Sequence, residues 1–437
     1  MLRLALPVLA EQLLGMLVVY SDTLLTGRNF GQPELAAINL LSYLLWMLGS
    51  VWFLVSIGST ALVARFVGAG DSQAAVRTTN QSLLAGVALA AAVTCIGVLW
   101  TDDLVGLLQL EGDAAQRATR YLYFVVPIVP FMMLEVVGIA CLRGAGDTVS
   151  GLVIMSIVNV TNICVSWPLA LGWFGLPAWG WDAVALSTAS GHLLGGCITL
   201  GLLVRGRSGL RISPRLLRPD ASLLRRILRV GVPGGIDVIT VIALHLWFVA
   251  IVNGLGVLEA AAHGIAIRIE SLAYLPGVAF QIAAATLAGQ YLGAGDRRGA
   301  TRSGRTPVGT GGGIVFGAGL LVLLRPEAIA SLFVSSEQRD VVTAAAPLLR
   351  IVSLAMPAFA LQVILTGALR GAGDTRWPLV FTLIGCLGVR IPLAYLFTGW
   401  LDYGLPGAWY AMVLDIFVRC ALVCLRFWRG RWQEIAV

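Results

Sequence analysis

Twelve long apolar segments, separated by short polar stretches, dominate the chain. Each is about 18 residues or longer, which is enough for a helix to cross a hydrocarbon core of about 30 Å. The alternating ten-residue segments of a membrane β-barrel are absent. The pattern therefore predicts an all-α integral membrane protein with twelve transmembrane helices. The predicted spans are 4–27, 36–64, 80–100, 121–142, 150–172, 183–204, 231–255, 261–291, 307–324, 347–369, 377–398 and 406–425.

The second half of the chain repeats landmarks of the first half at a nearly constant offset of 225 to 227 residues. The matched landmarks are Pro7 with Pro233, the GAGD segments ending at Asp71 and Asp296, Pro130 with Pro357, and the LRGAGDT segments holding Asp147 and Asp374. Each half holds six spans, an even number, so both halves enter the membrane from the same side as parallel repeats. We expect two six-helix lobes, the N-lobe (1–204) and the C-lobe (231–437), joined by an Arg-rich linker (205–230). We interpret the GAGD segments as turns, in which Gly ends one helix and Asp caps the next.

Composition and charge agree with a membrane protein. Of the 437 residues, 58% are hydrophobic and 12% are charged, whereas soluble domains carry about 25% charged residues. All 30 basic residues are Arg, and the formal net charge of +7 taken alone would suggest a nucleic-acid partner. However, 21 of them fall in loops on one side of the predicted topology and six on the other, and the positive side faces the cytoplasm. We therefore expect no nucleic-acid partner, and an inner-membrane protein with both termini in the cytoplasm.

The linker is the longest polar stretch of the chain. Its Arg211, Arg215 and Arg218 have helical spacing. An apolar stripe follows at Leu223, Leu224, Ile227 and Leu228. We predict a short amphipathic helix that lies on the inner membrane surface. A patch that binds a partner protein is the alternative.

The chain resembles the MATE (multidrug and toxic compound extrusion) transporters over nearly its whole length. The resemblance rests on Pro7…Glu11…Asp22-Thr23 in the first span, on GAGD after spans two and eight, on LRGAGDT after spans four and ten, and on RIESLAYLPGVAFQIAAATLAGQYLGAGD at 268–296. It implies two bundles of six helices around a central cleft. It also implies an inner-membrane antiporter that exports amphipathic, cationic small molecules (multidrug efflux) in exchange for Na⁺ or H⁺. No cofactor is expected besides that coupling ion.

Acidic residues inside the spans are the main functional candidates, because a charge at the membrane centre costs about 2.5–3.5 kcal/mol to insert. They are Glu11, Asp22, Glu135, Asp237, Glu270 and Asp415. The resemblance places at Asp22 the N-lobe aspartate that is linked to cation coupling. Asp22 shares a helical stripe with Glu11, and a buried carboxylate there can exchange a proton for a cation. The alternative is that Asp22 only hydrogen-bonds neighbouring helices.

Three polar residues on one face of the fifth span complete the predicted coupling site, namely Asn159, Asn162 and Ser166. Their oxygens could be neutral ligands for Na⁺, the only metal ion expected here. They could also hydrogen-bond Asp22, or simply hold helices together. MATE proteins often carry an aspartate where Ser166 stands, and this difference favours H⁺. The coupling ion stays open between H⁺ and Na⁺.

Aromatic rings and acids attract organic cations, which suggests a set of substrate-cavity residues. These candidates are Glu135, Glu270, His245, Tyr43, Trp46 and Tyr274. Glu135 and Glu270 could instead pair with Arg268 and Arg390, and the aromatic residues could belong to interfacial belts. We interpret Asp237 and Asp415 as residues that stabilise helix ends. Trp247 stands where the repeat would place a second Asp22, so the C-lobe does not repeat the coupling acid.

Other functions compete with antiport. A flippase for lipid-linked precursors, or a metabolite exporter, would share the architecture. Such a flippase would need a strongly cationic cavity, for which Arg268 and Arg390 are the candidates. A channel fits the asymmetric acids less well. An enzyme is not indicated, because HExxH, a Ser/His/Asp set at membrane depth and metal-ligand spacing of the seven Cys are all absent from the sequence. We expect a monomer that acts on small molecules in the bilayer.

Overall fold

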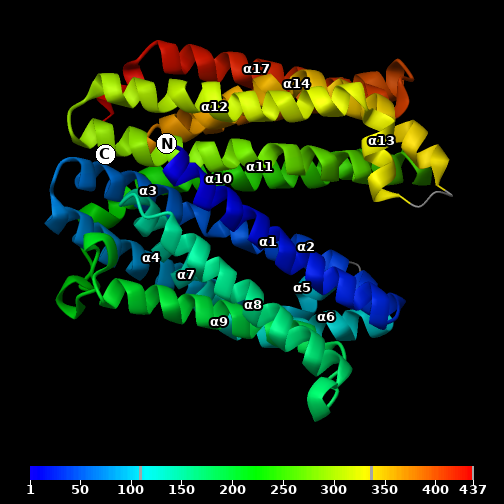
Figure 1. Cartoon of the computed structure of the whole chain (residues 1–437), viewed down its shortest axis with the longest axis horizontal. Helices are drawn as coiled ribbons and strands as arrows, with labels where there is room; N and C mark the ends of the chain where they lie inside the picture. The colour runs from blue at the N-terminus through cyan, green and yellow to red at the C-terminus, as the bar shows by residue number, and fades with distance from the viewer. Residues whose placement is uncertain (108–110, 335–337, 436–437) are drawn as a thin grey trace. The chain divides into compact units, whose positions relative to one another are not determined.

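The computed structural model describes residues 1–107, 111–334 and 338–435, which fold into helices joined by short loops (Figure 1). Twelve helical segments in this part of the chain are long and apolar enough to cross a membrane. The predicted all-α fold with twelve spans is confirmed. Most spans are single helices: α1 (Leu2–Asn29), α4 (Ser72–Leu99), α8 (Val149–Leu171), α9 (Asp182–Val204), α10 (Ala221–Asn253), α11 (Val257–Gly293), α12 (Arg297–Leu324), α14 (Arg339–Gly371) and α17 (Gly404–Trp428). Short helices α5 (Thr101–Leu107) and α13 (Pro326–Ala330) lie in loops.

The remaining spans are interrupted. The second divides at Trp52 into α2 (Gln32–Val51) and α3 (Phe53–Gly68). The fourth joins α6 (Gly112–Val125) to α7 (Val129–Gly144) through a 3₁₀ turn that contains Pro127, because proline lacks the N–H that an α-helix needs. The eleventh holds α15 (Arg376–Gly385), the π-helical η6 (Cys386–Arg390), α16 (Ile391–Tyr395) and the π-helical η7 (Leu396–Trp400).

The chain divides into two compact units with the same internal packing. Leu6–Gly231 forms the N-terminal unit, and Val232–Val437 together with Met1–Ala5 forms the C-terminal unit. In the N-terminal unit, α7 packs against α3, α4 and α9. In the C-terminal unit, α14 packs against α11, α12 and α17, and Figure 1 shows α12 and α17 alongside it. Because α14 repeats α7, the fourth span is the centre of each unit.

The GAGD segments form the predicted turns. A left-handed φ, between 74° and 90°, occurs at Gly70, Gly146, Gly295 and Gly373, and glycine adopts this conformation without steric cost. The carboxylates of Asp71 and Asp296 then accept hydrogen bonds from the backbone N–H groups of Ala74 at 2.9 Å and Gly299 at 2.8 Å. These contacts cap α4 and α12. The two repeats therefore end their second spans and begin their third spans in the same way.

Tight helix packing also repeats just before the LRGAGDT turns. A Cβ atom on Gly144 would lie 2.9 Å from the backbone oxygen of Thr60, and one on Gly371 would overlap the backbone oxygen of Ala285. Thr60 and Ala285 are equivalent in the repeat, as are Gly144 and Gly371. The second and fourth spans of each unit therefore cross at a glycine where backbone meets backbone.

Replacing Gly371 by Ala should destabilise the protein, because the added methyl group must displace the α11 backbone. Overpacking of this kind costs about 1–3 kcal/mol. Gly309→Ala in α12 is the matched control, since a Cβ there would meet nothing within 4 Å and Ala favours a helix over Gly. Thermal unfolding of the purified protein in detergent measures both variants. A Gly371→Ala midpoint equal to that of wild type would contradict the close crossing.

The amphipathic helix predicted for the linker is wrong in its first part. Residues 205–220 contain 3₁₀ turns at Arg207–Gly209 and Pro214–Leu216 in place of an α-helix. Pro214 and Pro219 explain the difference, because proline interrupts the hydrogen bonding of a helix interior. The second part, from Ala221, is helical, but it forms the first turns of α10 and is not a separate surface helix.

Candidate functional site

Asp22 lies on α1 inside the N-terminal unit, with 4% of its surface exposed. Its Oδ2 atom accepts hydrogen bonds from Thr188 Oγ1 of α9 at 3.1 Å and from Asn162 Nδ2 of α8 at 3.5 Å. Tyr121 of α6 donates in turn to Thr188 Oγ1 at 3.3 Å. The Oδ1 atom of Asp22 has no hydrogen-bond partner in the described ranges. The carboxylate is thus held at one oxygen and unpaired at the other.

Two tryptophans hold the part of α1 that carries Asp22. Trp167 of α8 donates from Nε1 to Ser21 Oγ at 3.2 Å, and Trp181 donates from Nε1 to Thr26 Oγ1 at 3.2 Å. Ser21 and Thr26 flank Asp22 on α1, one on each side. The two indoles therefore fix the register of α1 and position the carboxylate.

The three polar residues predicted on the fifth span are all buried on α8. Asn159, Asn162 and Ser166 are 4%, 0% and 0% exposed. In the described part of the chain, Asn159 Oδ1, Asn162 Oδ1 and Ser166 Oγ have no hydrogen-bond partner. Buried polar atoms are normally paired, and hard cations prefer oxygen ligands. The structure brings Asn162 to Asp22, and it places Asn159 and Ser166 one helical turn to either side of Asn162.

Glu135, a predicted cavity residue, lies in the N-terminal unit with a partner that the sequence did not indicate. It is 2% exposed on α7, and its Oε2 lies 2.9 Å from Nδ1 of His192 on α9. The suggested pairing with Arg268 or Arg390 is therefore wrong. His192 follows Thr188 by one helical turn and interacts electrostatically with Asp22. The spacing of Thr188 and His192 on α9 was a signal in the sequence, but it did not reveal that α7 and α1 lie against this face.

Trp247 occupies the position in the C-terminal unit that is equivalent to Asp22. Its ring meets Tyr395 edge-on, with 5.3 Å between the ring centroids. The two rings line a hollow of about 410 Å³ together with Ala250, Ile251 and Leu255. An apolar hollow thus stands in the C-terminal unit where the N-terminal unit has a carboxylate.

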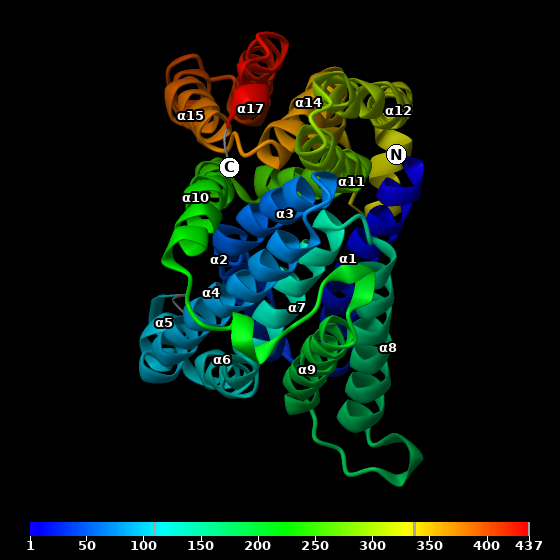
Figure 2. The ribbon, with the colours of Figure 1, turned by 90° about the vertical axis from the view of Figure 1, so that its left-hand side faces the viewer.

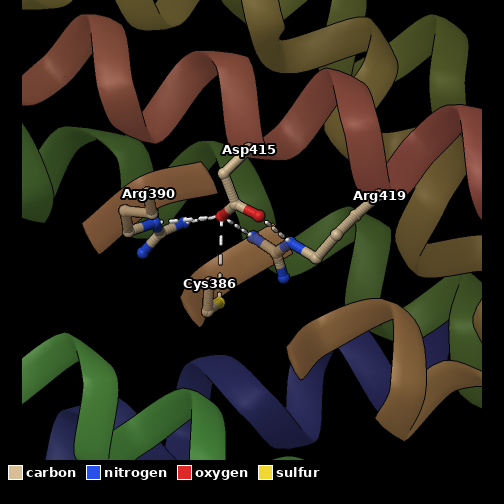
Figure 3. Close-up of polar contacts among 4 residues, drawn as sticks. All are labelled: Cys386, Arg390, Asp415 and Arg419. Carbon is tan, nitrogen blue, oxygen red and sulfur yellow. Dashed lines mark hydrogen bonds and ion pairs between the residues drawn. The ribbon is translucent and has the colours of Figure 1, made fainter. Parts of the chain in front are cut away.

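Asp415 lies in the middle of α17 and is fully buried, so its interpretation as a helix-end residue is wrong. Arg390 donates from Nε to its Oδ2 at 2.9 Å, and Arg419 donates from Nε to its Oδ1 and from Nη2 to its Oδ2, both at 2.7 Å. Figure 3 shows both guanidinium groups directed at the one carboxylate, with the Cys386 thiol beside it. Arg390 and Cys386 both come from the π-helical η6. We call Arg390, Asp415 and Arg419 the buried triad.

An acid on the first span of each unit pairs with the arginine of LRGAGDT. Glu11 lies 2.5 Å from Arg143, and Asp237 lies 2.7 Å from Arg370. Asp237 is therefore an internal ion-pair residue of α10 and not a helix-end residue, as the sequence had suggested. Each acid follows the proline of its span by four residues, a regularity that the sequence contains. Glu11 is thus neutralised by Arg143 near the LRGAGDT turn. Asp22, the other acid of α1, forms no ion pair with the described residues.

The aspartate of each LRGAGDT turn pairs with an arginine near the end of the sixth span of its unit. Asp147 lies 2.7 Å from Arg207, and Asp374 lies 2.8 Å from Arg426. Burial acts to raise the pKa of Asp147, but hydrogen bonds from Ser150, Arg207 and Ser208 outweigh it and hold that pKa below its usual range. These ion pairs tie the fourth and sixth spans together in both units.

The remaining cavity candidates divide between the units. Tyr43 and Trp46 lie exposed on α2 in the N-terminal unit. Glu270 and His245 lie in the C-terminal unit, where each interacts electrostatically with Arg390. Tyr274 stacks on Phe359 with 4.9 Å between ring centroids. In the C-terminal unit, Arg390 thus links Glu270 with His245, and Tyr274 interacts electrostatically with Glu270.

Known proteins similar to this chain share its fold, and one family model matches each of its halves. The sequence model of the MatE family matches residues 7–167 and again residues 233–396. A relative named "Probable multidrug resistance protein NorM" from Thermotoga maritima is 29% identical over 100% of this chain and 93% of its own length. One of the same name from Pseudomonas putida is 30% identical over 98% of this chain and 94% of its own length. A crystal structure of MATE in the bent conformation, 20% identical, has a TM-score of 0.91 and covers 99% of this chain and 95% of its own.

Proposed function

Because the chain belongs to the MatE family, we propose that it is a secondary antiporter that exports amphipathic, cationic small molecules in exchange for H⁺ or Na⁺. The family consists of transporters and not of enzymes. The multidrug-resistance names of its NorM relatives support the substrate class. The observation that carries the coupling role is the buried Asp22, whose Oδ1 is unpaired in the described residues, beside the amide of Asn162.

In the proposed cycle, Asp22 alternates between a charged carboxylate and a neutralised state. A proton bound to Oδ1, or a Na⁺ held by Asp22 with the oxygens of Asn159, Asn162 and Ser166, removes a negative charge from the interior. Thr188 and Asn162 then donate to a weaker acceptor, since charge-assisted hydrogen bonds are about twice as strong as neutral ones. The packing of α1 against α8 and α9 loosens in consequence. This change supports alternating access, in which the ion enters as the substrate leaves.

Two observations favour H⁺ as the coupling ion. Ser166 stands where MATE proteins often have a second acid, so the site offers one carboxylate in place of two. His192, paired with Glu135, adds an imidazole that interacts electrostatically with Asp22, and imidazole is the side chain that ordinarily titrates near neutral pH. Both features fit a proton better than a permanently bound cation.

The flippase alternative is less well supported. Recognition of an anionic lipid-linked precursor needs cationic groups that are not already neutralised. Arg390, one of the two candidates from the sequence, is engaged by Asp415. Arg268, the other candidate, is exposed, and a single arginine does not make the strongly cationic cavity that a flippase needs.

The proposed setting follows from the distribution of Arg. We place the chain in the inner membrane with both termini in the cytoplasm, since 21 of the 30 Arg fall in loops on that side. We propose separately that it acts as a monomer. We also propose the functional division into an N-lobe (1–204), a linker (205–230) and a C-lobe (231–437).

Transport in proteoliposomes tests the proposal. Vesicles that contain the purified protein and the fluorescent cation ethidium are given an inward-directed gradient of H⁺ or of Na⁺, each without the other. We expect the H⁺ gradient to drive loss of ethidium, and the Na⁺ gradient to drive little. Loss that is the same with and without an ion gradient, or an electrical conductance without ethidium movement, would contradict antiport.

A further inference from the structure

The Arg-rich linker is held against α4 by two consecutive buried amide side chains. Asn80 donates from Nδ2 to Arg211 O at 2.9 Å and accepts from the backbone N–H of Ser213 at 3.0 Å. Figure 2 shows the linker, in green, passing α7 and α4 on its way from α9 to α10. Both amides are buried, with exposed fractions of 0% for Asn80 and 2% for Gln81.

Gln81 holds the second half of the linker. Its Nε2 donates to the backbone oxygens of Leu216 and Arg218, both at 2.8 Å, and its Oε1 accepts from the N–H of Asp220 at 2.9 Å. Together with the contacts of Asn80, these bonds fix the linker backbone from residue 211 to residue 220. A segment that served only as a flexible tether between two bundles would not need them.

Fixing the backbone brings three arginines around one pocket. Arg77, one helical turn before Gln81 on α4, lines it with Arg215 and Arg218 of the linker. The pocket has a volume of about 150 Å³, and its other lining residues are Gln81, Leu216, Asp220 and Leu223. In the described ranges, none of the three guanidinium groups forms an ion pair. All of these residues belong to the N-terminal unit.

Asp220 leaves the pocket with an excess of positive charge. Its Oδ1 accepts hydrogen bonds from the Ser222 hydroxyl at 2.7 Å, the Ser222 N–H at 3.0 Å and the Leu223 N–H at 3.2 Å. Those donors, together with the nearby Arg77, hold the pKa of Asp220 below its usual range. The carboxylate therefore stays ionised, and its Oδ1 is committed to the start of α10. Three positive charges face one negative charge.

Among its described residues, the C-terminal unit does not repeat this arrangement. At the repeat offset of 225, Arg302 is equivalent to Arg77, but Arg305 and Thr306 replace Asn80 and Gln81. The segment after α17 does fold back onto α12, where Gln433 donates to Thr301 Oγ1 at 2.9 Å. In the described residues, however, no side chain at the positions of Asn80 and Gln81 holds that segment by its backbone as the two amides hold the linker. The pocket is therefore a feature of the N-terminal unit and not a general result of basic loops.

We propose that Arg77, Arg215 and Arg218 form a binding site for a phosphate group. Guanidinium groups match phosphate in charge and in hydrogen-bond geometry. Arg77 lies in the second turn of α4 and Leu223 in the first turn of α10, at the ends of two membrane spans. The pocket is thus at headgroup depth, where the phosphate of an anionic phospholipid and a soluble phosphate compound both have access.

Thermal unfolding of the full-length protein in detergent, with native mass spectrometry for bound lipid, tests the site. One arm adds phosphatidylglycerol to micelles that contain phosphatidylcholine, and the other adds inorganic phosphate to phosphatidylcholine alone. We expect a rise in the unfolding midpoint in at least one arm. A response to phosphatidylglycerol alone identifies a lipid headgroup, and a response to inorganic phosphate identifies a soluble ligand. No response in either arm overturns the proposal.

Three variants separate a built site from diffuse surface charge. Arg215→Gln with Arg218→Gln should weaken binding about tenfold for each arginine removed. The matched control, Arg302→Gln with Arg305→Gln in the C-terminal unit, removes equal charge and should bind as wild type. Gln81→Ala keeps every arginine but releases the linker, so it should lose binding as well. Equal binding by the double variant and its control, or wild-type binding by Gln81→Ala, overturns the proposal. None of these measurements depends on transport.

Discussion

Asp22→Asn should reduce gradient-driven efflux to the level of protein-free vesicles while leaving a folded protein. Asparagine has nearly the same shape as aspartate, so its single side-chain oxygen can take the place of Asp22 Oδ2 and still accept from Thr188 and Asn162. The asparagine side chain neither binds a proton nor carries a charge for Na⁺. Its amide also lies beside Asn162, whose Oδ1 is unpaired in the described residues and can accept a hydrogen bond. We therefore expect its stability to stay within about 1 kcal/mol of wild type, since one neutral hydrogen bond contributes about that much. Ethidium efflux from proteoliposomes is the measurement.

The control for Asp22→Asn is its neighbour on α1. Thr23→Ala removes a hydroxyl that donates to Val19 O of the same helix at 2.8 Å and keeps the carboxylate with its partners, so it should retain most of the efflux. Ser166→Ala then distinguishes the ions, because loss of a neutral oxygen weakens a Na⁺ site and leaves a protonation site nearly unchanged. Full ion-driven efflux by Asp22→Asn would contradict the proposed coupling role of this residue, whatever the outcome for the other variants.

Asp415→Asn should be among the most destabilising single substitutions in the chain. Arg390 and Arg419 are 8% and 6% exposed, and in the described residues both form their ion pairs with this one carboxylate. Removing one partner of a buried ion pair costs about 3–5 kcal/mol, because the remaining charge has no compensation. The thermal unfolding midpoint in detergent measures the loss. Asp402→Asn is the control, since Asp402 is exposed and has a φ of 54°, a conformation that Asn tolerates well.

A rescue variant separates loss of charge pairing from loss of packing in the buried triad. Asp415→Leu combined with Arg390→Met and Arg419→Met replaces three buried charged groups by apolar side chains. Such replacements are often neutral or stabilising, so the triple variant should recover most of the midpoint that Asp415→Asn loses. A triple variant as unstable as the single one would show that the carboxylate acts through something other than these two arginines.

The sequence predicted those parts of the structure that depend on periodicity and on local chemistry. Apolar length identified the spans, and the GAGD turns followed from the backbone freedom of Gly70 and Gly295 and from the capping capacity of Asp71 and Asp296. The amphipathic helix expected in the linker was wrong in its first part, because the spacing of charges does not outweigh Pro214 and Pro219. The linker instead takes its backbone hydrogen bonds from Asn80 and Gln81, more than 130 residues away.

The candidate site was predictable only as far as single helices allow. Asn159, Asn162 and Ser166 were placed on one face because helical spacing is a local property, and Asp22 stood out because it is an acid inside a span. Arg419 lies one helical turn after Asp415 on α17, a pairing that helical spacing indicates and that was missed. The partners of Glu11 and Glu135, and Arg390 as the second partner of Asp415, were not found. Each depends on which helices lie side by side, and the periodicity of one helix carries no information about its neighbours. The acid that recurs four residues after Pro7 and after Pro233 was a signal in the sequence that Glu11 and Asp237 have equivalent roles.

The contacts shared by the two units indicate that the units have a common evolutionary origin. The acid–arginine pairs Glu11–Arg143 and Asp237–Arg370, and the crossings at Gly144 and Gly371, have been retained in both copies. They point to descent from a six-span ancestor that was duplicated and fused, in which these contacts already held one bundle together. Asp22 and Trp247 occupy the same ancestral position but have since diverged. Under the coupling role proposed for Asp22, the ion chemistry belongs to one of the two copies alone.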